Sequence, residues 1–199
     1  MKNFKTLLVA LCLFSFCPFA QGFVSPIGLS IVPPVQFPSH KFSVVGVRAS
    51  VLWGQHRDVY GIDVVAIGNR TDQDFIGLGI SGLFNWTEGE TKIAFLQGAG
   101  FININSKKAK IYGLQVAGGA NYNSADSSTV GFQLALANLS THGRVYGAQI
   151  GAYNKAHKVY GLQIGIVNYA TELHGIQIGL INFHHKGTVS VSPILNIGF

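Results

Sequence analysis

The sequence Gly-Leu-Gln-Ile-Gly at residues 161–165 decides the fold, because it is one copy of a repeat. It returns as Gly-Ile-Gln-Ile-Gly at 175–179 and is preceded by Gly-Ala-Gln-Ile-Gly at 147–151, a step of 14 residues each time. An asparagine follows each of these glutamines by five places. Looser copies begin at Gly113 and Gly131, and weaker echoes lie at Gly61, Gly77 and Gln97. Such a repeat is typical of a repetitive all-β architecture rather than of a globular enzyme. The residues that we predict to form the structural repeat are Gly113, Gln115, Gly131, Gln133, Gly147, Gln149, Asn154, Gly161, Gln163, Asn168, Gly175, Gln177 and Asn182.

Period-two alternation within each copy indicates β-strands. One face of each strand carries large apolar side chains, and the other carries glycines and a central amide. In one copy these are Tyr160, Leu162, Ile164 and Ile166 against Gly161, Gln163 and Gly165. Glycine at this density argues against a helix, since each costs about 1 kcal/mol relative to alanine.

The composition is unusually poor in charge. Of the 199 residues, 48% are apolar and only 11% are charged, whereas soluble domains average about 25% charged residues. The formal net charge of +6 is a mild excess that calls for no nucleic-acid partner. Beyond the N-terminal segment no stretch is long and apolar enough for a membrane-spanning helix, so any crossing of a membrane would use strands.

The N-terminus has the pattern of a secretory signal peptide. Lys2 and Lys5 precede an apolar run over residues 7–20, and cleavage is expected after Ala20 or Gly22. We therefore predict a signal peptide at residues 1–22 and a single repetitive β-domain at residues 23–199. Both cysteines of the chain, Cys12 and Cys17, fall in the signal. The mature domain would then lack disulfides, thiolate metal sites and cysteine nucleophiles.

Two architectures fit a repeated strand. The strands are about nine to twelve residues long, which suits a membrane-spanning strand, and the changing repeat step fits hairpins of different length. We therefore expect an antiparallel up-and-down β-barrel of about 10–12 strands with its apolar face toward lipid. The alternative is a β-solenoid, in which equal residues of parallel strands stack as glutamine and asparagine ladders. We expect Leu162, Ile164 and Ile166 to point outward in a barrel and inward in a solenoid.

The last strand carries a further signal. Leu195, Ile197 and Phe199 alternate up to a terminal aromatic residue, which resembles the C-terminal assembly signal of bacterial outer-membrane barrels. Pro193 departs from that pattern. The resemblance implies that outer-membrane lipid and the barrel-assembly machinery are partners.

The repeat itself resembles that of bacterial surface repeat-containing proteins, which carry tandem Gly-Leu-Gln-Ile-Gly-Leu-x-Asn units. The matching stretches are Gly161–Asn168 and Gly175–Asn182, and Phe42–Gly61 is similar to the opening of that family. The resemblance implies an exported protein at the outer membrane or cell surface. It implies no activity.

No motif predicts chemistry. Residues 77–82 match G-x-G-x-x-G, but strand and turn residues follow where a nucleotide site needs a helix. The seven histidines fall near turns, and a basic cluster lies at Lys107, Lys108 and Lys110. Asp63 lies inside a strand where the repeats have glutamine, a position that we expect a barrel lumen but not a dry solenoid core to accept.

The function that follows from these patterns is not enzymatic. We predict no catalytic, cofactor-binding or metal residues, and neither nucleic acid nor nucleotide as a partner. The expected role is that of an exported outer-membrane or surface β-repeat protein in structure, minor-pore formation or display. The alternative is a periplasmic or surface β-solenoid that binds a partner.

Overall fold

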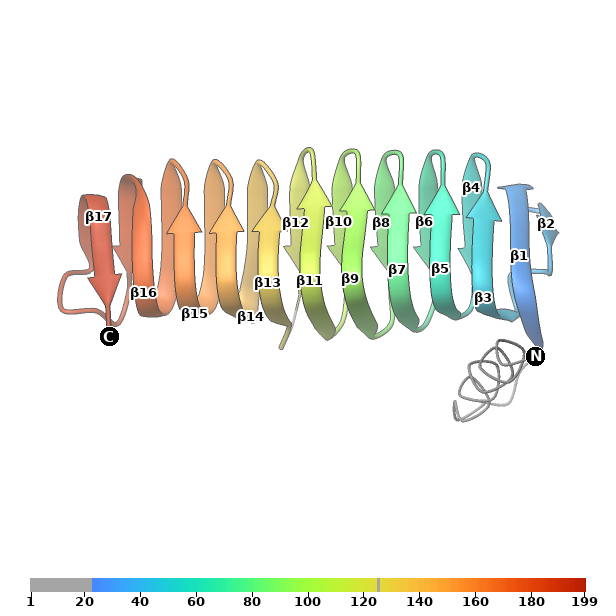
Figure 1. The fold of residues 1–199 in the computed structure, drawn as a ribbon, viewed down its shortest axis with the longest axis horizontal. Helices are drawn as coiled ribbons and strands as arrows, with labels where there is room; N and C mark the ends of the chain where they lie inside the picture. The colour runs from blue at the N-terminus through green and yellow to red at the C-terminus, as the bar shows by residue number, and fades with distance from the viewer. Residues whose placement is uncertain (1–22, 125) are drawn as a thin grey trace, which may run out of the picture.

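The chain winds into about ten stacked coils, and the stack extends from the N-terminal to the C-terminal end of the molecule (Figure 1). The computed structural model describes residues 23–124 and 126–199. The expected signal peptide, residues 1–22, lies outside this range. The described residues form strands and turns, and none belongs to a helix that is long and apolar enough to cross a membrane.

Each coil places one strand on a front face and one on a back face. The front strands, which point upward in Figure 1, are β3 (Ser43–Ser50), β5 (Val59–Val65), β7 (Phe75–Ser81), β9 (Thr91–Ala99), β11 (Ala109–Ala117) and β13 (Ser128–Leu134). The back strands are β4 (Trp53–His56), β6 (Gly68–Thr71), β8 (Phe84–Thr87), β10 (Ile102–Asn105) and β12 (Ala120–Asn123). In the last coils each back strand continues into the next front strand as β14 (Ala137–Ile150), β15 (Tyr153–Ile164) and β16 (Val167–His184). The ends are formed by β1 (Val24–Val32), β2 (Val35–Phe37) and β17 (Val191–Gly198).

Neighbouring coils pair in parallel and in register, so equal residues of the repeat lie side by side. Gly161 pairs with Gly147 on one side and with Gly175 on the other. Antiparallel pairing among the described strands is confined to the two ends, β1 with β2 and β16 with β17. An up-and-down barrel needs antiparallel neighbours throughout. The predicted barrel is therefore wrong, and the alternative, a β-solenoid, is the fold.

The solenoid has its apolar strand face outside, contrary to our expectation for this architecture. Gln163 is fully buried, whereas Ile166 is 54% exposed. The close stacking of coils explains the choice of small inward residues. Gly161 has φ +139°, and a Cβ there would clash with the carbonyl oxygen of Gly147 in the coil before. Only glycine combines that backbone conformation with such an approach.

Coil length and interior volume decrease together along the chain. The repeat step is 18 residues from Gly113 to Gly131, 16 to Gly147 and 14 to Gly161. Over the same coils one inward position of the back strand shrinks from asparagine through serine to alanine: Asn105, Asn123, Ser140, Ala156 and Ala170. A shorter coil thus encloses smaller side chains. The variable step, which favoured hairpins in the sequence, is compatible with a tapering solenoid.

Both ends of the stack carry proline. The prolines of the described residues are Pro26, Pro33, Pro34, Pro38 and Pro193, all in or beside the end strands β1, β2 and β17. Proline lacks the N–H that a further strand would require, and it is a common device for protecting sheet edges. Proline-free coils between proline-containing ends are the pattern expected of a finite stack.

Candidate functional site

A row of glutamines runs through the interior of the solenoid. Each Nε2 donates to the Oε1 of the glutamine one coil earlier, at 2.7–2.8 Å. The side chains are at most 1% exposed. The row consists of Gln97, Gln115, Gln133, Gln149, Gln163 and Gln177. Every predicted repeat glutamine is in it, and the structure adds Gln97 as a full member.

A parallel row of asparagines lies closer to the turns that join front to back strands. Its hydrogen bonds, 2.8–2.9 Å long, run in the opposite direction, since each Nδ2 donates to the Oδ1 of the next coil. The members are Asn85, Asn103, Asn121, Asn138, Asn154, Asn168 and Asn182. Because the two rows point opposite ways, their amide dipoles oppose each other along the axis. Four of these asparagines were missed in the sequence, although each lies five or six places after a glutamine or in the equivalent position of its coil.

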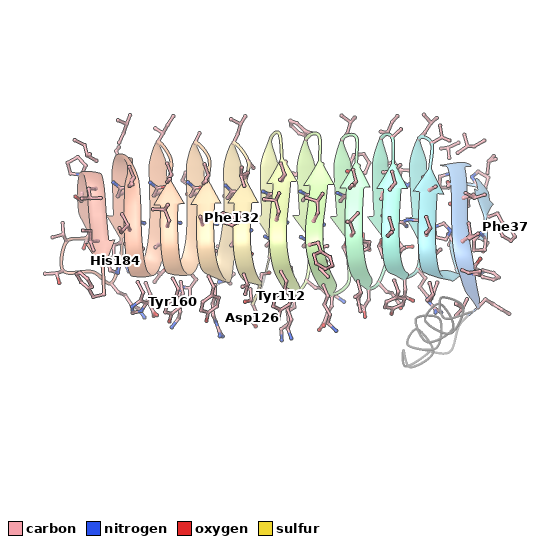
Figure 2. All side chains as sticks on the ribbon, viewed as in Figure 1. Phe37, Tyr112, Asp126, Phe132, Tyr160 and His184 are labelled. Atoms are coloured by element: carbon pink, nitrogen blue, oxygen red, sulfur yellow. The ribbon has the colours of Figure 1, made fainter. Side chains whose placement is uncertain are left out.

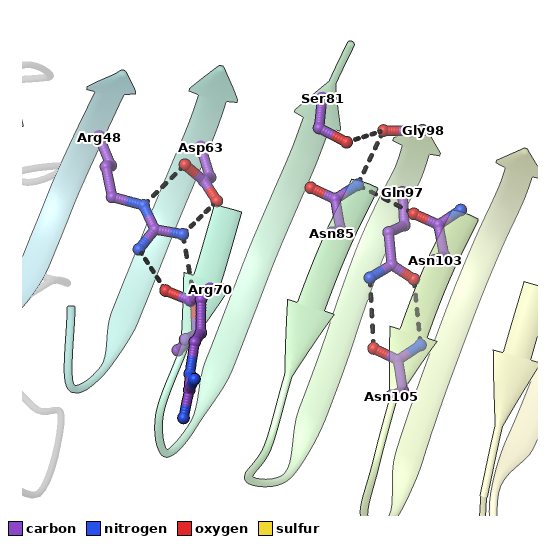
Figure 3. A network of polar contacts seen from close by, with 10 residues as sticks. Arg48, Asp63, Arg70, Ser81, Asn85, Gln97, Gly98, Asn103 and Asn105 are labelled. Atoms are coloured by element: carbon purple, nitrogen blue, oxygen red, sulfur yellow. Dashed lines mark hydrogen bonds and ion pairs between the residues drawn. The ribbon is translucent and has the colours of Figure 1, made fainter. Parts of the chain in front are cut away.

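An ion pair occupies the glutamine position in the first coils (Figure 3). The guanidinium of Arg48 donates to both carboxylate oxygens of Asp63, at 2.8 and 2.6 Å, and also to the backbone oxygen of Arg70 and to Thr71 Oγ1. Both charged side chains are buried. Asp63 therefore fits a dry solenoid core, contrary to our expectation, because Arg48 of the preceding coil neutralises it. Fully hydrogen-bonded pairs are the form in which charges are found buried.

The glutamine row has a gap between Asp63 and Gln97, where the equivalent residue is Gly79. The ring of Phe75 fills much of this space, since a Cβ on Gly79 would lie 3.2 Å from its Cζ. A cavity of about 10 Å³ remains, which is roughly the space of one water molecule. Asn69 lines it, and both polar atoms of its side chain lack a protein partner.

The row of turns that join back strands to front strands, which we call the basal edge, carries the charges. In Figure 2 nitrogen-containing side chains gather along this lower edge of the molecule. Glu172 accepts from Lys158 and Lys186, and these hydrogen bonds lower the pKa of its carboxyl group to about 2. Just above, Tyr146, Tyr160 and His174 stack in a row, with ring centroids 4.9 and 4.7 Å apart.

The opposite row of turns, which join front to back strands, forms what we call the apical edge. Its apolar residues are Leu52, Ile67, Leu83, Phe101, Leu136, Ile166 and Leu180, and their exposed fractions range from 37% to 68%. In every coil the segment from the residue after the repeat glycine to the asparagine position forms this half of the coil. The only charged residues in these segments are Arg48 and Asp63, which are buried.

The remaining polar features do not assemble a reactive site. Within residues 23–124 and 126–199, no group of three or more His, Cys, Asp or Glu side chains is placed to hold a metal ion. His56 is buried, and its desolvation, together with the charge of Arg48, lowers its pKa to about 4. A cavity of about 550 Å³ at the C-terminal end is lined by Glu172, His184, Lys186 and neighbouring residues. The glycines of the G-x-G-x-x-G match lie in β7 and the turn after it, with β8 following.

The predicted C-terminal signal lies on the last strand. Leu195 and Ile197 are in β17 and pair with Ile178 and Ile176 of β16. Both side chains are about half exposed, and Phe199 is fully exposed. Their role in assembly stays a prediction.

Among known proteins, no family model, no curated protein and no solved structure matches this chain. The geometry of the coils, with amides inside and apolar residues outside, is what supports a proposal of function.

Proposed function

We propose that the protein is an exported β-solenoid of the cell envelope that binds a partner along its length and has no catalytic role. One observation carries this proposal: an apolar edge runs the length of the stack without an exposed charge. Soluble monomers rarely expose contiguous apolar patches beyond a few hundred Å², and larger ones mark interaction sites. The signal-like N-terminus supports the envelope as the place where this interaction occurs.

The interior favours a binding role over a pore. The glutamines and asparagines of the described coils are fully buried and bonded to each other, so these residues leave no lumen for a solute. Parallel stacking with coil-to-coil amide rows is rigid, since moving one coil breaks rungs on both sides. A rigid rod with one distinct edge suits a scaffold or display element whose partner meets many equal positions.

Fractionation of cells that express the full chain tests the envelope location. We expect the protein in the envelope fraction, with a new N-terminus near residue 21 or 23 by N-terminal sequencing. The Leu11→Asp variant, which interrupts the apolar run of the signal, should stay in the cytoplasm with its N-terminal segment intact. Cytoplasmic, uncleaved wild-type protein would contradict the proposal.

A further inference from the structure

We propose that the apical half of the solenoid inserts into one leaflet of a lipid bilayer, so that the partner along the apolar edge is a layer of acyl chains. This inference rests on the proposed envelope location and names the partner. It begins from an inversion of polarity within each coil. In the basal half, Val159 and Leu173 are buried while Lys158 and Glu172 lie outside, as in a water-soluble protein. In the apical half, the amides are buried and the exposed surface is apolar.

Backbone hydrogen bonding permits the apical turns to leave water. Exposed loops are normally excluded from hydrocarbon because their N–H and C=O groups would be unpaired. Here the turns pair with one another from coil to coil. Leu83 N–H donates to the carbonyl of Ile67, Phe101 N–H donates to that of Leu83 at 2.8 Å, and Ile181 N–H donates to that of Ile166 at 3.0 Å. The pairing that satisfies strands in the sheet therefore continues over the edge.

The shape of the surface favours lipid over a second copy of this chain. The apical edge is a ridge one turn wide, with apolar residues on both flanks, such as Ile178 on the front and Phe84 on the back (Figure 1). Two such ridges would meet along a line and leave their flanks in water. Fluid acyl chains surround a ridge and both flanks at once.

Dimensions and aromatic residues place the boundary of the inserted part. Four strand residues separate the repeat glycine's successor from the apical turn, about 13 Å at 3.3 Å per residue, which is close to half of a hydrocarbon core of about 30 Å. Below this level aromatic side chains lie on both faces: Tyr112 and Tyr160 on the front, at the lower edge of Figure 2, and Tyr122 on the back. Tyrosine and tryptophan are enriched at membrane–water interfaces.

Two native tryptophans report insertion directly. Trp53 directly follows Leu52 of the apical edge, whereas Trp86 is three residues beyond Leu83 and stacks with Arg70. We expect the purified protein to float with phosphatidylcholine vesicles in 0.5 M salt, a condition that screens charge attraction. Lipids brominated along their acyl chains should quench Trp53 more strongly than Trp86, measured in the Trp86→Phe and Trp53→Phe variants.

Matched arginine substitutions localise the contact. Leu136→Arg with Ile166→Arg should lower the vesicle partition coefficient by about tenfold or more, because each charge is placed in hydrocarbon. The control, Val130→Arg, lies at an exposed position just below the boundary and should change partitioning by less than about twofold. Melting temperatures by circular dichroism establish that all variants are folded.

Several results would overturn the inference. These are a wild-type protein that does not float, equal flotation of the apical variants, binding to anionic vesicles alone that is lost in salt, and a dimer that the apical substitutions dissociate. Purified protein and vesicles test lipid insertion independently of cellular location. An envelope protein that ignores vesicles would therefore refute this inference and leave the proposed function standing.

Discussion

At the scale of single residues, the buried amides define this structure. A glutamine in the interior both donates to one neighbour and accepts from another, so a mid-row residue serves two rungs. One such hydrogen bond has a modest net value, about 0.5–1.5 kcal/mol, but leaving its partners unpaired in the interior costs about 1–3 kcal/mol for each group. The interior is thus more sensitive to a missing amide than to a missing methyl group.

The glutamine row predicts a graded loss of stability. Gln149→Met keeps the volume but strands Gln133 Oε1 and Gln163 Nε2, so unfolding by urea should require about 2–5 kcal/mol less free energy. Gln177→Met at the end of the row strands only Gln163 Oε1, and we expect about half that loss. The outward Ile150→Met is the matched control and should change stability by less than about 1 kcal/mol. A Gln149→Met variant as stable as this control would show that the amide row contributes nothing.

Part of the residue pattern was predictable from the sequence, and part was not. The glutamine and asparagine positions followed from the repeat. The pair of Arg48 and Asp63 did not, because it joins residues 15 places apart whose adjacency depends on the parallel register. The gap at Gly79 filled by Phe75 is likewise invisible until coils are stacked.

At the scale of elements, each coil is an interchangeable unit. Parallel in-register pairing means that a coil contacts only the coil before and the coil after it, as in other repeat proteins. The sequence showed strands and turns but could not give their direction. The repeat is nearly palindromic about its glutamine, so both parallel and antiparallel neighbours align the same residues. Polarity misled as well, because amides inside a solenoid satisfy each other as well as they would line a lumen.

Removal of one whole coil should therefore be tolerated. Deletion of residues 161–174 joins Tyr160 to Gly175 and preserves both the register and the alternation of faces. We expect a folded protein with an unchanged β-sheet spectrum by circular dichroism and a modestly lower melting temperature. Deletion of residues 161–173 is the control. It shifts the following strand by one residue, turns Gln177 outward and should abolish folding. Equal behaviour of the two deletions would contradict the coil as the structural unit.

At the scale of the whole molecule, the stack is a rod with two chemically different edges. The basal edge carries the charges and the tyrosine row, and the apical edge is apolar (Figure 2). Repetition is what produces this arrangement, because every coil places equal residues at equal heights. The proposals of an envelope location and of leaflet insertion depend on this long-range order, which in turn depends on parallel stacking.

Spin labels test the parallel stacking most directly. Residues 146 and 160 are stacked tyrosines in the structure, with ring centroids 4.9 Å apart. Neighbouring strands are about 4.8 Å apart, so labels on cysteines at 146 and 160 should show strong spin exchange when Cys12 and Cys17 are replaced by serine. Labels at 146 and 166 should lie about 20 Å or more apart, because the two positions belong to opposite edges. In an antiparallel meander paired through Gln149 and Gln163, residue 146 would instead meet residue 166. Exchange at 146 and 160 alone is the predicted result; exchange at 146 and 166 would contradict the solenoid.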